Sequence, residues 1–260
     1  MKYSINAANR YIIKTADEYK CNFNRLGDII DLIETTKARL NILYEPQDIH
    51  KDSEILISQI KILRKKEIEF TVACKNLKTL HQVLDLEAPA YLDLPISDWE
   101  MLNNVLEWNV SDVWIDGPLC FAADGVRSLT HNVNVRMTPH MSGNAGFGEG
   151  RRSNAYSAFI RPEDVEVYET FIDILDFKTD NIETERALFN IYKRGYFNNN
   201  LKELIQQLNF SYVNNTLIPK RFAEKRLNCQ QRCQTPFGHC FICERLLSLT
   251  NKMEDFMKKS

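Results

Sequence analysis

Three short apolar runs in the middle of the chain each end in polar residues that are able to do chemistry. They lie at residues 113–118, 134–140 and 158–164. Each run has the length of a strand buried on both faces, and about one helix's worth of sequence, residues 119–131, separates the first two. This order of segments is typical of parallel strands joined by helical crossovers.

Five further segments extend the same pattern along the chain. Strands are predicted at 18–24, 39–46, 69–75, 90–95 and 173–177, and most are followed by amphipathic or capped stretches with the spacing of a helix. Eight parallel strands are the number that closes a barrel. The predicted fold is therefore α/β, a (βα)8 TIM-like barrel with a C-terminal helical, cysteine-rich appendage. Two domains divided near Asn109 are the rival arrangement.

The predicted division of the chain is a barrel over residues 1–208 and an appendage over 209–260, packed on the barrel. The second part has little strand periodicity, and its basic residues gather in one stretch: Lys220, Arg221, Lys225, Arg226 and Arg232. No flexible Pro/Gly/Ser linker separates the two parts, so we expect them to dock.

Composition limits the class of protein. A chain of 260 residues with 44% hydrophobic and 26% charged residues can bury a full-sized core. Its formal net charge of -2 argues against a surface coated in basic residues for nucleic acid. The sequence has neither an apolar run of the ~20 residues that span a bilayer nor a signal-peptide core. These features predict a soluble cytoplasmic protein without membrane contact.

Four of the seven cysteines stand close together, as Cys229, Cys233, Cys240 and Cys243. Thiolates this near in sequence can converge on one metal with little loss of chain entropy. The Cys-x3-Cys-x6-Cys-x2-Cys spacing is irregular for a zinc ribbon and acceptable for an iron-sulfur cluster, so a 4Fe-4S cluster is favoured over zinc. Two local disulfides or unligated thiols remain alternatives, and His239 is read as a loop residue. The other cysteines, Cys21, Cys74 and Cys120, are predicted to be buried core residues.

Polar residues at strand ends supply the candidate active site, because the carboxyl ends of barrel strands face one side of the fold. The candidate catalytic residues are Asp116, His140, Lys75 and Asp93, with Glu45 at another strand end. Lys75 near Asp116 would give an acid/base pair, and His140 has an ordinary pKa suited to proton transfer near neutrality. Arg136 and Arg161 are candidates for binding a substrate carboxylate or phosphate. For each residue taken singly, a helix cap or rim salt bridge is the competing interpretation.

A glycine-rich loop at residues 143–150 follows the sixth predicted strand and is followed directly by two arginines. Backbone amides freed by glycine, together with Asn144, Arg151 and Arg152, could surround an anion. A mobile lid or an ordinary exposed loop would explain the same composition. Trp99, Trp108 and Trp114 are predicted to lie in the core.

The strand-plus-proline pieces 91–95 and 114–120, with the late cysteine cluster, resemble the collagenase-like peptidase family. That family's barrel members include iron-sulfur proteins that hydroxylate ring carbons, so the resemblance implies a barrel, a cluster on the four late cysteines and redox chemistry. The family's acidic residue followed by a glycine- and cysteine-containing segment is not found here, which makes a peptidase less favoured.

The predicted function is an iron-sulfur-dependent redox or hydroxylase-like enzyme acting on a small anionic or nucleotide-like substrate at the strand ends. The rival is a non-catalytic barrel whose zinc-stapled basic tail binds RNA or a protein partner.

Overall fold

The computed structural model describes residues 1–7, 15–139, 160–179, 181–204, 215–218 and 222–227. Within these ranges the chain forms one parallel sheet with helices between its strands. No helix in the described ranges is both long and apolar enough to cross a membrane.

The sheet has eight strands, and the strands that pair within it run parallel. The strands are β1 (Lys2–Asn6), β2 (Glu18–Asn22), β3 (Arg39–Tyr44), β4 (Phe70–Cys74), β5 (Ala90–Leu92), β6 (Asp112–Trp114), β7 (Asn134–Met137) and β8 (Ile174–Asp176). Their spatial order is β5-β4-β3-β2-β1-β8-β7-β6. Strands on both sides of Asn109 therefore belong to the same sheet.

The two outer strands of that order come together and nearly close the sheet into a barrel. Ile96, after β5, forms a parallel bridge with Ile115, after β6. Its amide donates to the Trp114 carbonyl at 2.8 Å, and its carbonyl accepts from the Asp116 amide, also at 2.8 Å. At the other end the Ser111 amide donates to the Ala90 carbonyl at 2.9 Å. The architecture is thus consistent with a (βα)8 barrel.

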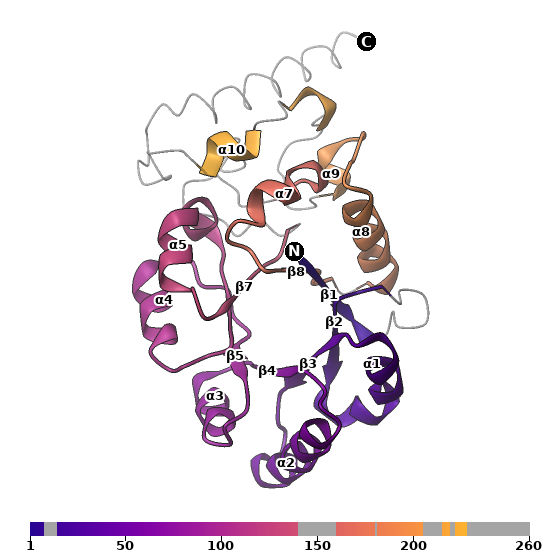
Figure 1. Cartoon of the computed structure of the whole chain (residues 1–260), viewed down its shortest axis with the longest axis vertical. Coiled ribbons are helices and arrows are strands. Elements are labelled where there is room, and N and C mark those ends of the chain that lie inside the picture. Colours follow the sequence, from indigo (N-terminus) through magenta and orange to yellow (C-terminus); the bar gives the residue numbers. More distant parts are fainter. Residues whose placement is uncertain (8–14, 140–159, 180, 205–214, 219–221, 228–260) are drawn as a thin grey trace.

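Helices surround the strands, which form an inner ring in Figure 1. They are α1 (Ile30–Thr36), α2 (Ile49–Lys65), α3 (Leu77–Leu84), α4 (Trp99–Leu106), α5 (Ala123–Leu129), α7 (Val165–Tyr168), α8 (Ile182–Arg194), α9 (Leu201–Leu204) and α10 (Phe222–Leu227). Short 3-10 helices occur at η2 (Phe23–Asp28), η3 (Gly117–Phe121), η4 (Pro162–Asp164) and η5 (Asn215–Leu217).

Helix α2 shows why the crossovers are helical. Asp48 is the N-cap, and its side chain accepts hydrogen bonds from the His50 and Lys51 amides. Asp52, in the first turn of the helix, accepts hydrogen bonds from the amides of Gln47 and Asp48, and these bonds stabilise the start of the helix. Three apolar residues at helical spacing, Leu56, Ile60 and Leu63, are buried against the sheet.

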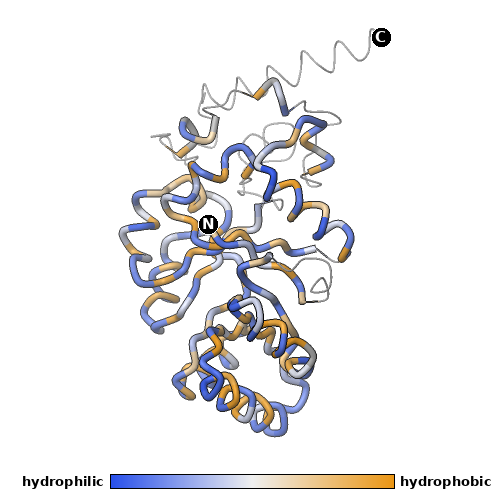
Figure 2. The backbone as a smooth tube through the Cα atoms, turned by 45° about the vertical axis from the view of Figure 1, so that its right-hand side comes forward, coloured by the Kyte–Doolittle hydropathy of each residue, from blue (hydrophilic) through white to orange (hydrophobic). Residues whose placement is uncertain are grey.

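Most strands alternate between apolar residues of the hydrophobic core and residues, many of them polar, that face the barrel interior. In β3, Leu40 and Ile42 belong to the hydrophobic core, whereas Arg39 and Asn41 are buried among polar partners. Hydrophilic and hydrophobic residues accordingly interleave along the chain in Figure 2 instead of forming separate blocks. The hydrophobic core is therefore a shell between strands and helices, and the barrel interior is charged.

One strand was missed and one predicted strand was wrong. Residues 2–6 form β1, where no strand was predicted. The predicted strand at 158–164 does not lie between β7 and β8, because these two strands pair directly with each other. The described part of that segment, from Ile160, continues into η4 at Pro162. The count of eight strands was right, but the barrel begins at Lys2 instead of Glu18.

The described part of the C-terminal region contacts the barrel's helical layer. Asn215 is 3% exposed, and its side-chain amide donates to Glu163 at 2.7 Å and to the Phe197 carbonyl. Ile218 and Ala223 are buried, and α10 contacts α7 and η3. The described residues 215–218 and 222–227 are thus held against the barrel's outer layer around η4, α7 and η3.

Candidate functional site at the carboxyl ends of the strands

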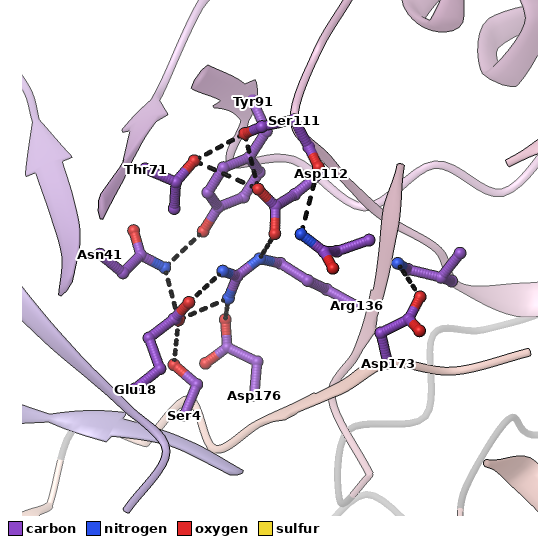
Figure 3. Close-up of polar contacts among 12 residues, drawn as sticks. Ser4, Glu18, Asn41, Thr71, Tyr91, Ser111, Asp112, Arg136, Asp173 and Asp176 are labelled. Atoms are coloured by element: carbon purple, nitrogen blue, oxygen red, sulfur yellow. Dashed lines mark hydrogen bonds and ion pairs between the residues drawn. The ribbon is translucent and has the colours of Figure 1, made fainter. Parts of the chain in front are cut away.

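Arg136 of β7 is the centre of a polar network inside the barrel (Figure 3). Its side chain is fully buried, and its guanidinium donates to both oxygens of Glu18 at 2.8 and 2.6 Å and to Asp112 at 3.1 Å. It also lies 4.7 Å from the ring centroid of Tyr91. We call this group the interior network: Ser4, Glu18, Lys20, Arg39, Asn41, Thr71, Tyr91, Ser111, Asp112, Arg136 and Asp176.

Asp112 is the second anchor of the interior network. Arg39 donates to its two oxygens at 2.8 Å each, and Ser111 and Thr71 donate at 2.6 and 3.2 Å. Burial alone would raise the pKa of the Asp112 carboxyl, but the charges of Arg136 and Arg39 outweigh it and lower the pKa to about 2. The carboxylate therefore stays ionised well into acid.

Lys20 and Asp176 form the part of the network nearest the carboxyl ends of the strands. The Lys20 ammonium donates to Asp176 and to the Phe177 carbonyl, both at 2.6 Å, and lies 3.7 Å from buried Glu185. Burial opposes ionisation of Asp176, but Lys20, Lys178 and Arg136 together lower its pKa below the ordinary value. Lys20 is thus committed to partners within the fold.

Beyond that layer, four residues from different strands meet at the carboxyl end of the barrel: Lys75, Asp93, Trp114 and Lys178. We call them the carboxyl-end cluster. Asp93 is only 5% exposed and is shared by two ammonium groups, with Lys75 at 3.0 Å from one oxygen and Lys178 hydrogen-bonded to the other. The cluster contains two cations and one carboxylate, so it has an excess of positive charge.

Lys178 and Lys75 differ in burial although they share a partner. The Lys75 side chain is 50% exposed, whereas that of Lys178 is 21% exposed and its Nζ lies 3.4 Å from the centroid of the Trp114 ring. Burial lowers the pKa of Lys178 below its ordinary value, and the attraction of Asp176 and Asp93 only partly offsets that effect. An amine of this kind is more readily deprotonated than a surface lysine.

Thr138 is a further polar group at this end of β7. It is 3% exposed, and its hydroxyl has no hydrogen-bond partner in the described part of the chain. By the alternation of the strand it lies on the same inward side as Arg136, two residues earlier. An unpaired buried hydroxyl costs free energy, so its presence suits a position where a ligand can bond to it.

The structure separates the strand-end residues predicted from sequence. Lys75 was predicted to pair with Asp116, but its ion-pair partner is Asp93. Asp93 also pairs with Lys178. Asp116 accepts a hydrogen bond from the Gly117 amide at 2.7 Å and caps η3.

The remaining described candidates are distributed elsewhere. Glu45 is exposed after β3. Arg136 is fully engaged in the interior network. Arg161 is 2% exposed and pairs with Asp164 and with Asn215 near the C-terminal region. The placement of both arginines therefore favours a structural role over substrate binding.

Several candidates lie outside the described residues. They are His140, Asn144, Arg151 and Arg152 with the glycine-rich loop, and the proposed metal ligands Cys229, Cys233, Cys240 and Cys243. Among the described residues no group of three or more His, Cys, Asp or Glu side chains could hold a metal ion. Cys21, Cys74 and Cys120 are buried, as predicted.

Sequence reasoning missed Lys178 and misjudged Trp114, which was predicted to be core. Trp114 lies two residues after Asp112 and therefore shares its inward side, while Lys178 lies two residues after Asp176. The signal was the alternation itself: a polar residue inside the barrel predicts that the position two residues later also points inward.

No protein-family model, curated protein or solved structure matches this chain.

Proposed function

We propose that this protein is an enzyme that acts on a small anionic substrate at the carboxyl ends of its barrel strands. The observation that supports it is the carboxyl-end cluster, in which two lysines share the single carboxylate of Asp93. In (βα)8 barrels this end holds the active site in essentially every characterised enzyme. The surplus positive charge at a partly desolvated position favours an anion.

Lys75 is the group that would meet the incoming anion first. Its side chain is half exposed, and Asp93 retains Lys178 as a partner if Lys75 turns away. A substrate carboxylate or phosphate can therefore take Lys75 without leaving Asp93 unpaired, which avoids the large cost of an uncompensated buried charge. Trp114 offers an aromatic face beside the same lysine pair.

Binding of simple anions tests this part of the proposal. Titration calorimetry with inorganic phosphate and with malonate should detect binding that Lys75→Met weakens by about tenfold, the equivalent of one charge-assisted hydrogen bond. Lys66→Met is the matched control, because Lys66 pairs with Glu34 at 2.5 Å on the outer surface and is similarly exposed. Equal affinities in all three proteins, or no binding, would reject an anion site at Asp93.

We further propose that Cys229, Cys233, Cys240 and Cys243 hold a metal centre, with a 4Fe-4S cluster favoured over zinc. Four thiols in one short stretch are a donor set that fits either group. A cluster would supply one-electron redox chemistry and make the protein an oxidoreductase, the hydroxylase-like activity that the resemblance implies. The described residues that precede the first cysteine, 215–218 and 222–227, pack against the helical layer, which supports a metal centre near the barrel.

Anaerobic purification tests the metal centre. A brown protein with bound iron and sulfide supports the cluster, whereas a colourless protein with one zinc would overturn it and support the rival function, a basic tail that binds RNA or a protein partner. Cys233→Ser should lower the metal content while leaving the cooperative unfolding of the barrel nearly unchanged. Full metal content in that variant would show that the four cysteines are not one site.

A further inference from the structure

Among the residues of the carboxyl-end cluster, Lys178 is the amine whose surroundings differ most from those of a surface lysine. It follows β8 directly, its Nζ stands over the face of Trp114 at 3.4 Å, and Asp93 accepts its hydrogen bond. Lys193 provides a contrast within the same chain: its Nζ lies 4.5 Å from the Tyr3 ring, but its side chain is exposed. The aromatic contact is common to both lysines, and the burial and the carboxylate distinguish Lys178.

Two carboxylates attract Lys178, Asp176 and Asp93, and Lys20 repels it. Asp176 of β8 is also bonded to Lys20 at 2.6 Å and lies 3.7 Å from Arg136, so the interior network shares its charge. Asp93 accepts the Lys178 hydrogen bond and shares its charge with Lys75. Burial lowers the pKa of Lys178 despite these carboxylates.

We propose that Lys178 is a nucleophilic amine that forms an imine with the carbonyl carbon of a small 2-oxo acid. The inference rests on the proposed anion site and names the substrate class it takes. A 2-oxo acid carries a carboxylate next to an electrophilic carbonyl, and the cluster offers a half-exposed cation, Lys75, on one oxygen of Asp93 and the buried amine on the other. One 2-oxo acid could therefore place its carboxylate at Lys75 and its carbonyl carbon at Lys178.

The covalent step balances within the cluster. Asp93 takes a proton from the Lys178 ammonium, and the neutral amine adds to the carbonyl carbon, whose C=O π electrons move to oxygen. Asp93 returns that proton to the oxygen, takes a second proton from the adduct nitrogen and delivers it to the resulting hydroxyl. Water then leaves, and the lone pair freed on the nitrogen forms the C=N bond. The net change is one ammonium and one carbonyl giving one iminium and one water, with charge conserved and no oxidant or reductant consumed.

Reductive trapping tests the inference. Pyruvate and glyoxylate are incubated separately with the full-length protein and sodium cyanoborohydride, and the adduct is located by peptide mass mapping. We expect a single reduced adduct at Lys178 with each acid, absent from Lys178→Arg and retained in Lys193→Arg. Mapping of the unaltered protein locates the site even if Lys178→Arg does not fold.

Three outcomes would overturn the inference: no adduct, an adduct at Lys75, or labelling spread over exposed lysines such as Lys193. Its failure is distinguishable from failure of the anion site, because malonate has no ketone and binds without forming an imine. Malonate binding without a trapped adduct rejects the imine and leaves the anion site standing. Loss of both rejects the two proposals together.

Discussion

Arg136 and Glu18 are 118 residues apart in the chain, yet their side chains form two parallel hydrogen bonds of 2.8 and 2.6 Å inside the barrel. Neither side chain is exposed to solvent. Glu18 also accepts from Ser4 of β1 at 2.7 Å and from Asn41 of β3 at 3.1 Å, so the two strands beside β2 hold its carboxylate as well. The pair connects β7 to the opposite wall, where β2 lies.

Breaking this pair should be costly. Arg136→Leu leaves Glu18 buried without its principal cation, and we expect the free energy of unfolding to fall by about 3–5 kcal/mol. Urea titrations measure the loss. Replacing both residues by leucine should recover much of it, because no uncompensated charge then remains. Lys66→Met, which breaks the exposed pair with Glu34, should cost at most about 1 kcal/mol and serves as the control. A cost for Arg136→Leu no larger than that control would contradict the prediction.

Stability should fall in acid because of Asp112. Its folded-state pKa of about 2 lies below the ordinary value of 3.8, so the stability that its ionised form contributes is fully present above that value and is lost as the pH falls toward about 2. Asp176, whose pKa is also lowered, acts in the same direction. The two values for Asp112 correspond to about 2 kcal/mol. Urea midpoints measured from neutral pH down to this window check it, and added salt should change the drop little because the groups are buried.

Thr138 and Thr71 form a matched pair for testing buried hydroxyls. Thr71 is fully buried and bonds to Ser111 at 2.7 Å and to Asp112, so Thr71→Val should cost about 1–3 kcal/mol. Thr138 has no such partner in the described ranges, so Thr138→Val should leave stability unchanged or raise it by up to about 1 kcal/mol. Thermal or urea unfolding separates the two. A large loss in Thr138→Val would show that its hydroxyl already has a partner in the fold.

The Cys74 thiol should be inert in the folded protein. It is fully buried, and burial, with a smaller effect from Asp93, raises its pKa to about 12. Because the thiolate is the reactive form, iodoacetamide at mildly alkaline pH should modify Cys74 only after denaturation. Peptide mapping of native and urea-unfolded samples measures this, and the unfolded sample is the positive control. Rapid native modification of Cys74 would be incompatible with this packing.

Asn215 should help to hold η5 and α10 against the barrel. Asn215→Ala removes its contacts with Glu163, the Phe197 carbonyl and Arg161, so trypsin should cut faster after Lys225 or Arg226 in α10. The barrel's cooperative unfolding should change little. Asn198→Ala, at an exposed position nearby, is the control and should not change the cleavage rate. Equal cleavage of the two variants would mean that other contacts fix the segment.

Sequence patterns were sufficient for the fold class because outward-facing apolar residues repeat along each strand and each helix has an amphipathic face. They failed at β1 because Lys2, Ser4 and Asn6 looked like exposed polar residues, although Ser4 is fully buried. A barrel interior is usually apolar, so inward polar positions imitate solvent-facing ones. The apolar run before Arg161 was taken as a strand for the converse reason, since Ile160, its described residue, is buried but lies in a non-strand connection.

The candidate site was predicted only in part. Lys75 and Asp93 were found because strand ends can be located from the sequence. Lys178 was not, since its partner Asp93 is 85 residues away and no local pattern reports that contact. Arg136 was predicted to bind substrate because an arginine near a strand end resembles an anion ligand. Its carboxylate partners are in fact Glu18 of β2 and Asp112 of β6, which no local sequence pattern indicates.

The charged interior of the barrel also determines how its strands align. Five strands, β2, β3, β6, β7 and β8, carry an inward carboxylate or guanidinium. Sliding one of them by a single residue would turn that group toward the apolar helical shell and bring a residue such as Val135 or Tyr19 into the interior network. In a barrel filled with interchangeable aliphatic side chains, such a slip changes mainly the packing. Here it would leave several opposite charges unpaired at once, so misaligned assemblies lie far above the native one in free energy. The interior network therefore selects the native strand register when the sheet closes, because only that register pairs all of its buried charges.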